Sequence, residues 1–176
     1  MHQVTRIFSL ALIFSVGIVL ILGSTSQPNR PVSPVSKISD IDFDRYNGVG
    51  KCSIKGQAFL KTRGGDVKYG AGEAVTLVPD LPLLNDILRI NSTPGQYSAL
   101  PPDVERKWQQ LTRKTQANGQ GEFEFNGIPC ESWFVESRVS WEVPISRYST
   151  SLQGGPVSTR VNISPQNSPA KVILTQ

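Results

Sequence analysis

The sequence predicts an all-β protein: an antiparallel β-sandwich of about seven strands, with one or two short helices inserted between strands. Three observations lead to this prediction. Polar and apolar residues alternate in short segments between residues 52 and 175, as they do in strands with one buried face. Turn-forming Gly, Pro and Asn residues separate these segments. Helical spacing interrupts the alternation over residues 80–111.

The clearest turn and strand lie in residues 117–129, ANGQGEFEFNGIP. Asn118, Gly119 and Gly121 tolerate the positive φ angles that a tight hairpin turn needs. Residues 122–125 then alternate glutamate with phenylalanine, which is the period of a half-buried strand. We therefore predict a hairpin turn followed by a strand whose two rings face the core.

The other strands are expected on both sides of this hairpin, at residues 52–60, 73–79, 132–141, 158–163 and 170–175, with room for a seventh at 112–117. A polar loop is expected over residues 144–156. The inward-facing positions supply the predicted core: Ile54, Leu60, Val75, Leu77, Phe123, Phe125, Trp133, Val135, Val139, Val161 and Leu174.

The helical region is the least sandwich-like part of the chain. Leucine and isoleucine recur at helical spacing over residues 83–90, and Val104, Trp108 and Leu111 follow at i, i+4 and i+7. Helices are predicted only here, between residues 80 and 111. Such an apolar stripe more commonly covers a core than binds a partner, and a partner surface is the alternative.

Residues 1–26 have the features of a targeting segment. Arg6 gives a basic start, residues 7–22 are mostly apolar, and residues 23–26 are small. The apolar run is shorter than the roughly 20 residues that a spanning helix needs. We predict a signal peptide cleaved near Ser26 and a periplasmic or secreted protein. An uncleaved N-terminal helix anchored in the inner membrane is the alternative.

Residues 27–48 are rich in proline and serine and are predicted to be a flexible linker before a sandwich domain at 49–176. The acidic residues 40–44 invite a calcium interpretation. An EF-hand loop that starts at residue 40 would need Gly at position 45 and Glu at position 51, where the chain has Arg45 and Lys51. No metal or cofactor site is therefore predicted.

The charge of the chain is mild. Its 18 basic and 14 acidic residues are dispersed, so the sequence does not favour nucleic acid as a partner. Loss of residues 1–26 would also remove His2, the only histidine. Without histidine the chain has no Ser-His-Asp triad and no His-ligated zinc. Glu122 and Glu124 remain as carboxylates for acid–base catalysis, but exposed glutamates on a strand are far commoner, and we expect no enzyme.

Aromatic side chains are the candidate ligand-binding groups, because rings stack on the apolar faces of sugars. Trp133 and Trp141 share the predicted inner face and are assigned to the core. Phe134 falls on the polar face of its strand. With Tyr97 and Tyr148, which lie in expected loops, it forms the candidate binding surface.

Cys52 and Cys130 are expected to form a disulfide. Both lie at predicted strand ends, where the backbone can adjust to the geometry of the bond, and an exported protein would retain it. The alternative is two isolated thiols.

Several segments together resemble bacterial carboxypeptidase-regulatory-like domains, which have a transthyretin-like β-sandwich. The similar segments are residues 56–72 and 75–79, the hairpin 117–125, the turn 127–129, the strand 133–139 and the closing strand 172–175. The resemblance implies a non-catalytic accessory module that aids folding or binds partners. We therefore expect a structural or interaction role in the bacterial cell envelope, with an envelope protein or a glycan as partner. A carbohydrate-binding module is the alternative.

Two features depart from the pattern of that family. A small residue and a glycine usually follow the proline of the turn, and here Cys130 and Glu131 follow Pro129. The helical insertion is also longer than the fold requires. The first departure suggests that Cys130 has a role of its own.

Overall fold

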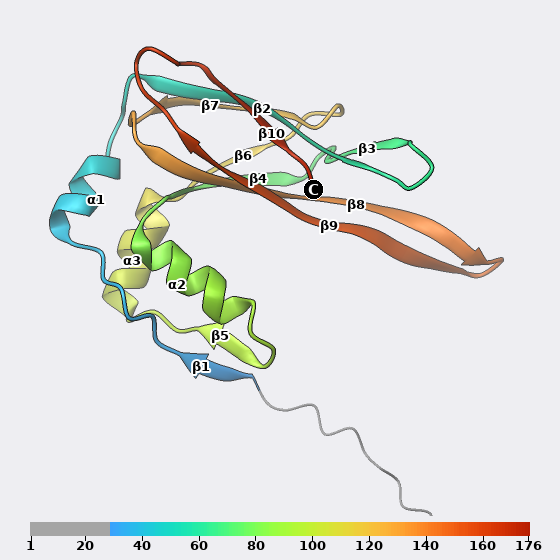
Figure 1. Ribbon diagram of the computed structural model, residues 1–176, viewed down its shortest axis with the longest axis horizontal. Helices are drawn as coiled ribbons and strands as arrows, with labels where there is room; N and C mark the ends of the chain where they lie inside the picture. Colours follow the sequence, from blue (N-terminus) through green and yellow to red (C-terminus); the bar gives the residue numbers. More distant parts are fainter. Residues whose placement is uncertain (1–28) are drawn as a thin grey trace, which may run out of the picture.

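The computed structural model describes residues 29–176 and shows two four-stranded sheets packed face to face, with helices on the outer side of one sheet (Figure 1). This arrangement confirms the predicted all-β sandwich. The two sheets hold eight strands rather than about seven, and a short pair, β1 (Arg30–Val32) with β5 (Gln96–Ser98), lies outside them.

The first sheet is organised around β2 (Cys52–Lys61). At one edge β7 (Glu122–Ile128) pairs with it in antiparallel fashion, and at the other edge β10 (Ala170–Leu174) pairs with it in parallel. The short β3 (Val67–Tyr69) continues the sheet beyond them by pairing with the last three residues of β2. The parallel pairing of β10 is an exception to the predicted antiparallel order.

The second sheet has the strand order β6-β4-β8-β9 and is antiparallel throughout. Its members are β4 (Ala74–Pro79), β6 (Arg113–Gln116), β8 (Ser132–Ser146) and β9 (Ser149–Asn162). Strand β6 occupies the place that the sequence left for an additional strand.

The predicted polar loop over residues 144–156 is wrong. Strands β8 and β9 instead remain paired almost to their turn, with Trp141 opposite Gln153 and Val143 opposite Ser151. The alternation of apolar residues on β8 continues through Trp141 and Val143, which is why the strand does not stop where the core ends. The resulting hairpin extends past the first sheet as an arm (Figure 1).

The core lies between the facing surfaces of the two sheets. All the predicted core residues are buried there except Val161, which is partly buried against the cluster. Trp133, Ile54 and Leu77 are among its largest fully buried side chains. The period-two pattern thus identified the inner faces of both sheets correctly.

Two helices fill the insertion between β4 and β6, as predicted. Helices α2 (Pro82–Asn91) and α3 (Pro102–Leu111) each begin with a proline in the first turn, where its missing N–H costs nothing. They form a third layer on the outer side of the second sheet (Figure 1). Leu84 and Trp108 pack there in a small second cluster of apolar side chains.

A third helix, α1 (Asp40–Tyr46), precedes the sandwich. It contradicts both the flexible linker predicted for residues 27–48 and the restriction of helices to residues 80–111. The helix forms because Ser39 and Asp42 make a capping box: the Ser39 hydroxyl accepts from the Asp42 N–H at 3.1 Å, and the Asp42 carboxylate accepts from the Ser39 N–H at 3.3 Å.

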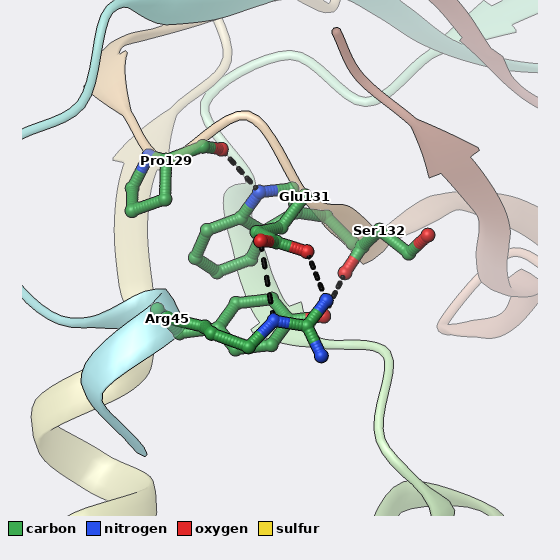
Figure 2. Close-up of polar contacts among 6 residues, drawn as sticks. Arg45, Pro129, Glu131 and Ser132 are labelled. Atoms are coloured by element: carbon green, nitrogen blue, oxygen red, sulfur yellow. Dashed lines mark hydrogen bonds and ion pairs between the residues drawn. The ribbon is translucent and has the colours of Figure 1, made fainter. Parts of the chain in front are cut away.

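Helix α1 is fixed to the sandwich by the residues that follow Pro129 (Figure 2). The Tyr46 hydroxyl donates to the Ser132 carbonyl at 2.8 Å, and the Arg45 guanidinium pairs with the Glu131 carboxylate. The Trp133 indole N–H donates to the Pro129 carbonyl at 3.0 Å. A stretch that the sequence presents as a turn is therefore the docking site for the N-terminal helix.

Cys52 and Cys130 form the predicted disulfide, with Cα atoms 5.3 Å apart. Cys130 therefore has the separate role that its departure from the family pattern suggests, and Glu131 beside it holds Arg45. Disulfides of this kind are typical of oxidising, exported compartments.

The predicted signal peptide or anchor, residues 1–26, lies outside the described residues. Within residues 29–176, each helix is too short or too polar to cross a bilayer.

Candidate functional site

The three aromatic residues of the predicted binding surface lie apart from one another. Phe134 is buried, which contradicts its predicted surface role, because the insertion folds over the outer face of β8 and covers it with Leu84 and Trp108. Tyr148 is exposed at the tip of the β8–β9 arm. Tyr97 is exposed on β5, within the insertion.

Tyr97 borders a groove of about 510 Å³ that is built entirely from the insertion. We call it the insertion groove. Helices α2 and α3 and the segment after β5 contribute its lining: Ile87, Tyr97, Ser98, Ala99, Leu100, Glu105, Trp108 and Gln109. Its size falls within the range of about 300–1,000 Å³ that is usual for small-ligand sites.

Helix α3 supplies the polar and the larger aromatic side of the groove. Glu105, Trp108 and Gln109 follow one another at i, i+3 and i+4, which places them on one face of the helix. The indole of Trp108 is half-buried, because it also packs on the cluster beneath it. The aromatic side chain is thus held by packing while the two polar groups beside it are exposed.

The opposite side of the groove depends on a return of the chain after α2. Gly95 has a φ of +71°, a conformation that favours glycine, and it brings β5 back along the helix. The Ser98 N–H donates to the Asn91 side-chain carbonyl at 2.8 Å, and the Ala99 N–H donates to the Val32 carbonyl at 2.9 Å. These bonds fix the backbone that carries Tyr97.

Residues 30–36, which we call the N-terminal strap, hold this backbone from outside. Strand β1 pairs in parallel with β5, and the N–H groups of Val35 and Ser36 donate to one oxygen of the Asp86 carboxylate at 3.0 and 2.7 Å. These hydrogen bonds hold the pKa of Asp86 below its usual range, and the bond from the Ser36 main chain has the largest effect. The strap therefore links α2 to β5 on the side of the insertion away from the sandwich.

The groove carries one charged side chain. The Gln109 amide donates to one oxygen of the Glu105 carboxylate at 3.2 Å, which leaves the second oxygen and the amide carbonyl free to face a ligand. Tyr97 is 46% exposed. An exposed ring beside a carboxylate and an amide can stack on an apolar face of a ligand and hydrogen-bond its hydroxyl groups.

No family model and no curated protein matches the chain. One solved structure that resembles it is a protein from Pseudomonas aeruginosa, described as a candidate carbohydrate-binding protein. The two are 22% identical, with a TM-score of 0.63, over 80% of this chain and 99% of the other. This similarity shows that the two proteins share a fold.

Two other depressions offer less to a ligand. One of about 460 Å³ at the open end of the sandwich is lined by Phe59, Lys61 and Trp141. There Gly154 lies against the indole, because a Cβ at that position would be 3.0 Å from it, and so part of the ring is already covered. The other, about 710 Å³, is lined mostly by polar residues of β2, β7 and β10 with Thr115 and Gln116 of β6, and its aromatic side chain, Phe123, is buried.

The carboxylates considered for acid–base catalysis have protein partners. A Glu122 carboxylate oxygen accepts from the Asn118 amide at 2.9 Å, and Glu124 lies 3.4 Å from the Lys55 ammonium. Both are exposed on β7. Within residues 29–176, the structure contains no group of three side chains that could hold a metal ion.

Sequence reasoning missed the polar half of the groove. Neither Glu105 nor Gln109 is among the candidate binding residues predicted from the sequence. The available signal was their spacing with Trp108, because residues at i, i+3 and i+4 must share a helical face. What the spacing could not show was that Tyr97 lies opposite that face.

Proposed function

We propose that this chain is a non-catalytic, exported β-sandwich module that binds carbohydrate in the insertion groove. The observation that carries the proposal is the combination of the exposed Tyr97 ring and the Trp108 indole with the Glu105–Gln109 pair in one groove. Sugars present both apolar faces and hydroxyl groups, so a site for them needs aromatic and polar groups together.

Two further observations support parts of this proposal. The candidate carbohydrate-binding protein from Pseudomonas aeruginosa shares the fold, although at this low identity no residue role is transferred from it to this chain. The disulfide supports export to an oxidising compartment, either the periplasm or the exterior, with an uncleaved inner-membrane anchor as the alternative. We also propose that the chain is related to carboxypeptidase-regulatory-like domains.

The proposal is tested by measuring binding to a glycan array and then by calorimetry on the glycans that bind. Tyr97→Ala should weaken binding by about tenfold or more, as truncation of an aromatic anchor commonly does. Tyr148→Ala is the matched control, since Tyr148 is 91% exposed and lies on the arm, away from the groove. Equal affinity of the two variants, or no glycan bound by the wild type, would reject the insertion groove as a carbohydrate site.

A second candidate function, an interaction module of the bacterial cell envelope, is favoured by the β8–β9 arm. Ile145 and Leu152 are 68% and 65% exposed there, although both are large aliphatic side chains. A two-stranded ribbon is only marginally stable alone, and a protein partner would cover these residues.

This second function predicts a different sensitivity to mutation. Ile145→Asp and Leu152→Asp should abolish crosslinking of the intact exported protein to an envelope protein, while Tyr97→Ala should leave it unchanged. Unchanged crosslinking of the arm variants would exclude the arm as the contact surface.

A further inference from the structure

The charge around the insertion groove has a consequence for the kind of sugar that fits. Among the described residues that line the groove, Glu105 alone is charged, and no lysine or arginine lines it. A carboxylate at the contact surface repels anionic ligands, whereas hydroxyl groups can donate to it.

Two neighbouring basic side chains make their contacts elsewhere. Lys107, on α3, lies over the Phe43 ring of α1, 5.7 Å from its centroid. Arg89, on α2, lies 3.5 Å from the Asp86 carboxylate. On α3, residue 107 follows Glu105 by roughly 200° around the helix axis and so lies on the side of the helix away from the groove. The basic groups of Lys107 and Arg89 are therefore held at contacts outside the groove.

The hydrogen-bonding groups of the Glu105–Gln109 pair also determine which ligand groups it can bind. With one carboxylate oxygen engaged by the amide, the pair offers the second carboxylate oxygen as an acceptor, the amide carbonyl as another, and one amide hydrogen as a donor. Neighbouring hydroxyl groups of a sugar ring, each both donor and acceptor, complement this set. A ligand carboxylate or sulfate, which has acceptors alone, could use only the single amide hydrogen.

We propose that the insertion groove accepts uncharged glycan units and rejects anionic ones, and that Glu105 is the residue that determines this discrimination. The inference rests on the proposed carbohydrate-binding function and adds the ligand class to it. Tyr97 and Trp108 would supply the stacking surface, which any sugar can use, while Glu105 would supply the discrimination.

The test compares four oligosaccharides of equal length: cellohexaose, the hexamers of N-acetylglucosamine and glucosamine, and the hexamer of galacturonic acid. Calorimetry with the full chain at neutral pH should show binding of at least one uncharged hexamer. The galacturonic acid hexamer should bind about tenfold more weakly or worse, because like charges would face each other. Binding of the uncharged hexamer should change little with salt, since no ion pair forms.

Variants of Glu105 then separate its charge from its shape. Glu105→Gln should weaken binding of the uncharged hexamer, because an amide replaces the charged acceptor, and should reduce the discrimination against galacturonic acid. Glu105→Lys should reverse the discrimination. Glu142→Gln, on the arm, is the control for loss of a remote carboxylate. Glu105 is exposed, so these variants are expected to fold, and circular dichroism verifies this.

The outcomes distinguish the two proposals. Tighter binding of the galacturonic acid hexamer than of both uncharged hexamers would overturn the ligand class but leave carbohydrate binding intact. The same holds if Glu105→Lys left the preference unchanged. Binding of the glucosamine hexamer that Glu105→Gln weakens would instead support a carboxylate at the contact surface. No binding of any hexamer, with none on a wider glycan array, would overturn the carbohydrate function itself.

Discussion

The Tyr46 ring meets the Trp133 ring edge to face, with ring centroids 4.9 Å apart and ring planes at 89°. Trp133 begins the longest strand of the sandwich, and Tyr46 ends the helix that precedes the first core strand. Through this contact the N-terminal segment becomes part of the core. Trp133 is fully buried, and 2% of Tyr46 is exposed.

This contact predicts a loss of stability at alkaline pH. The pKa of Tyr46 is raised to about 12, chiefly by burial of the hydroxyl. The folded protein keeps the Tyr46 proton more strongly than the unfolded chain does. The contribution of the protonated hydroxyl to stability is therefore complete below about pH 10, the ordinary tyrosine pKa. It should be lost as the pH rises toward 12. Urea denaturation as a function of pH measures the loss.

Tyr46→Phe isolates this effect, because it keeps the ring but removes the hydroxyl. The variant should be less stable at neutral pH by about 1 kcal/mol, the usual contribution of one hydrogen bond. The steep alkaline loss should be smaller in the variant than in the wild type. If Tyr46→Phe and the control Tyr148→Phe had the same alkaline profile as the wild type, Tyr46 would not be the responsible group.

The disulfide should contribute substantially to stability. Cys52 and Cys130 are separated by 78 residues in sequence, and closing so long a loop stabilises a fold by about 4 kcal/mol in the chain-entropy model. The double variant Cys52→Ala/Cys130→Ala should therefore unfold at much lower urea concentration. Reductant should destabilise the wild type and have no effect on the variant. Labelling of two thiols in the unreduced, unfolded protein would disprove the bond.

The N-terminal strap should detach in acid. The pKa of the Asp86 carboxylate is lowered by the hydrogen bonds it accepts from the strap, so the carboxylate's contribution is present above about pH 4, the ordinary aspartate pKa. It should be lost as the pH falls through the lower pKa of the folded state. Hydrogen exchange at the amides of Val35 and Ser36, corrected for the intrinsic effect of pH, should show the loss of protection.

Asp86→Asn should remove the pH dependence of this protection, while Asp66→Asn, in a loop of the first sheet, should not. Because the strap also fixes the backbone that carries Tyr97, its release should weaken any ligand bound in the insertion groove. Protection that stayed constant from neutral pH to well below pH 4 in the wild type would show that the carboxylate does not hold the strap.

Close packing between β2 and β7 predicts a sharp response to one added methyl group. A Cβ at position 56 would lie 2.3 Å from the Phe123 ring and 2.7 Å from the Val172 carbonyl oxygen. Gly56→Ala should therefore destabilise the protein by about 1–3 kcal/mol, the usual cost of overpacking. Gly119→Ala is the matched control, since nothing lies within 4 Å of its Cβ position. Equal thermal midpoints for the two variants would contradict this packing.

The sequence by itself determined the inner faces of the sheets and the position of the helical insertion, and it favoured the pairing of the cysteines over two isolated thiols. Alternation along a strand is a local property, so Phe123 and Phe125 could be assigned to the core without knowing their neighbours. The same was true of the stripe in α3, where Trp108 was assigned to a covered face. Two cysteines at strand ends left one intramolecular pairing to consider.

Only the tertiary structure decided what covers each outer face. Phe134 and Tyr148 both read as surface residues, yet the insertion folds over Phe134 and leaves Tyr148 exposed. The groove exists because β5 returns along α2 and brings Tyr97 to the groove that Glu105 also lines, a placement that helical periodicity does not encode. A residue pattern specifies which side of an element is apolar; the packing of distant segments decides whether that side meets the core, another layer or a ligand.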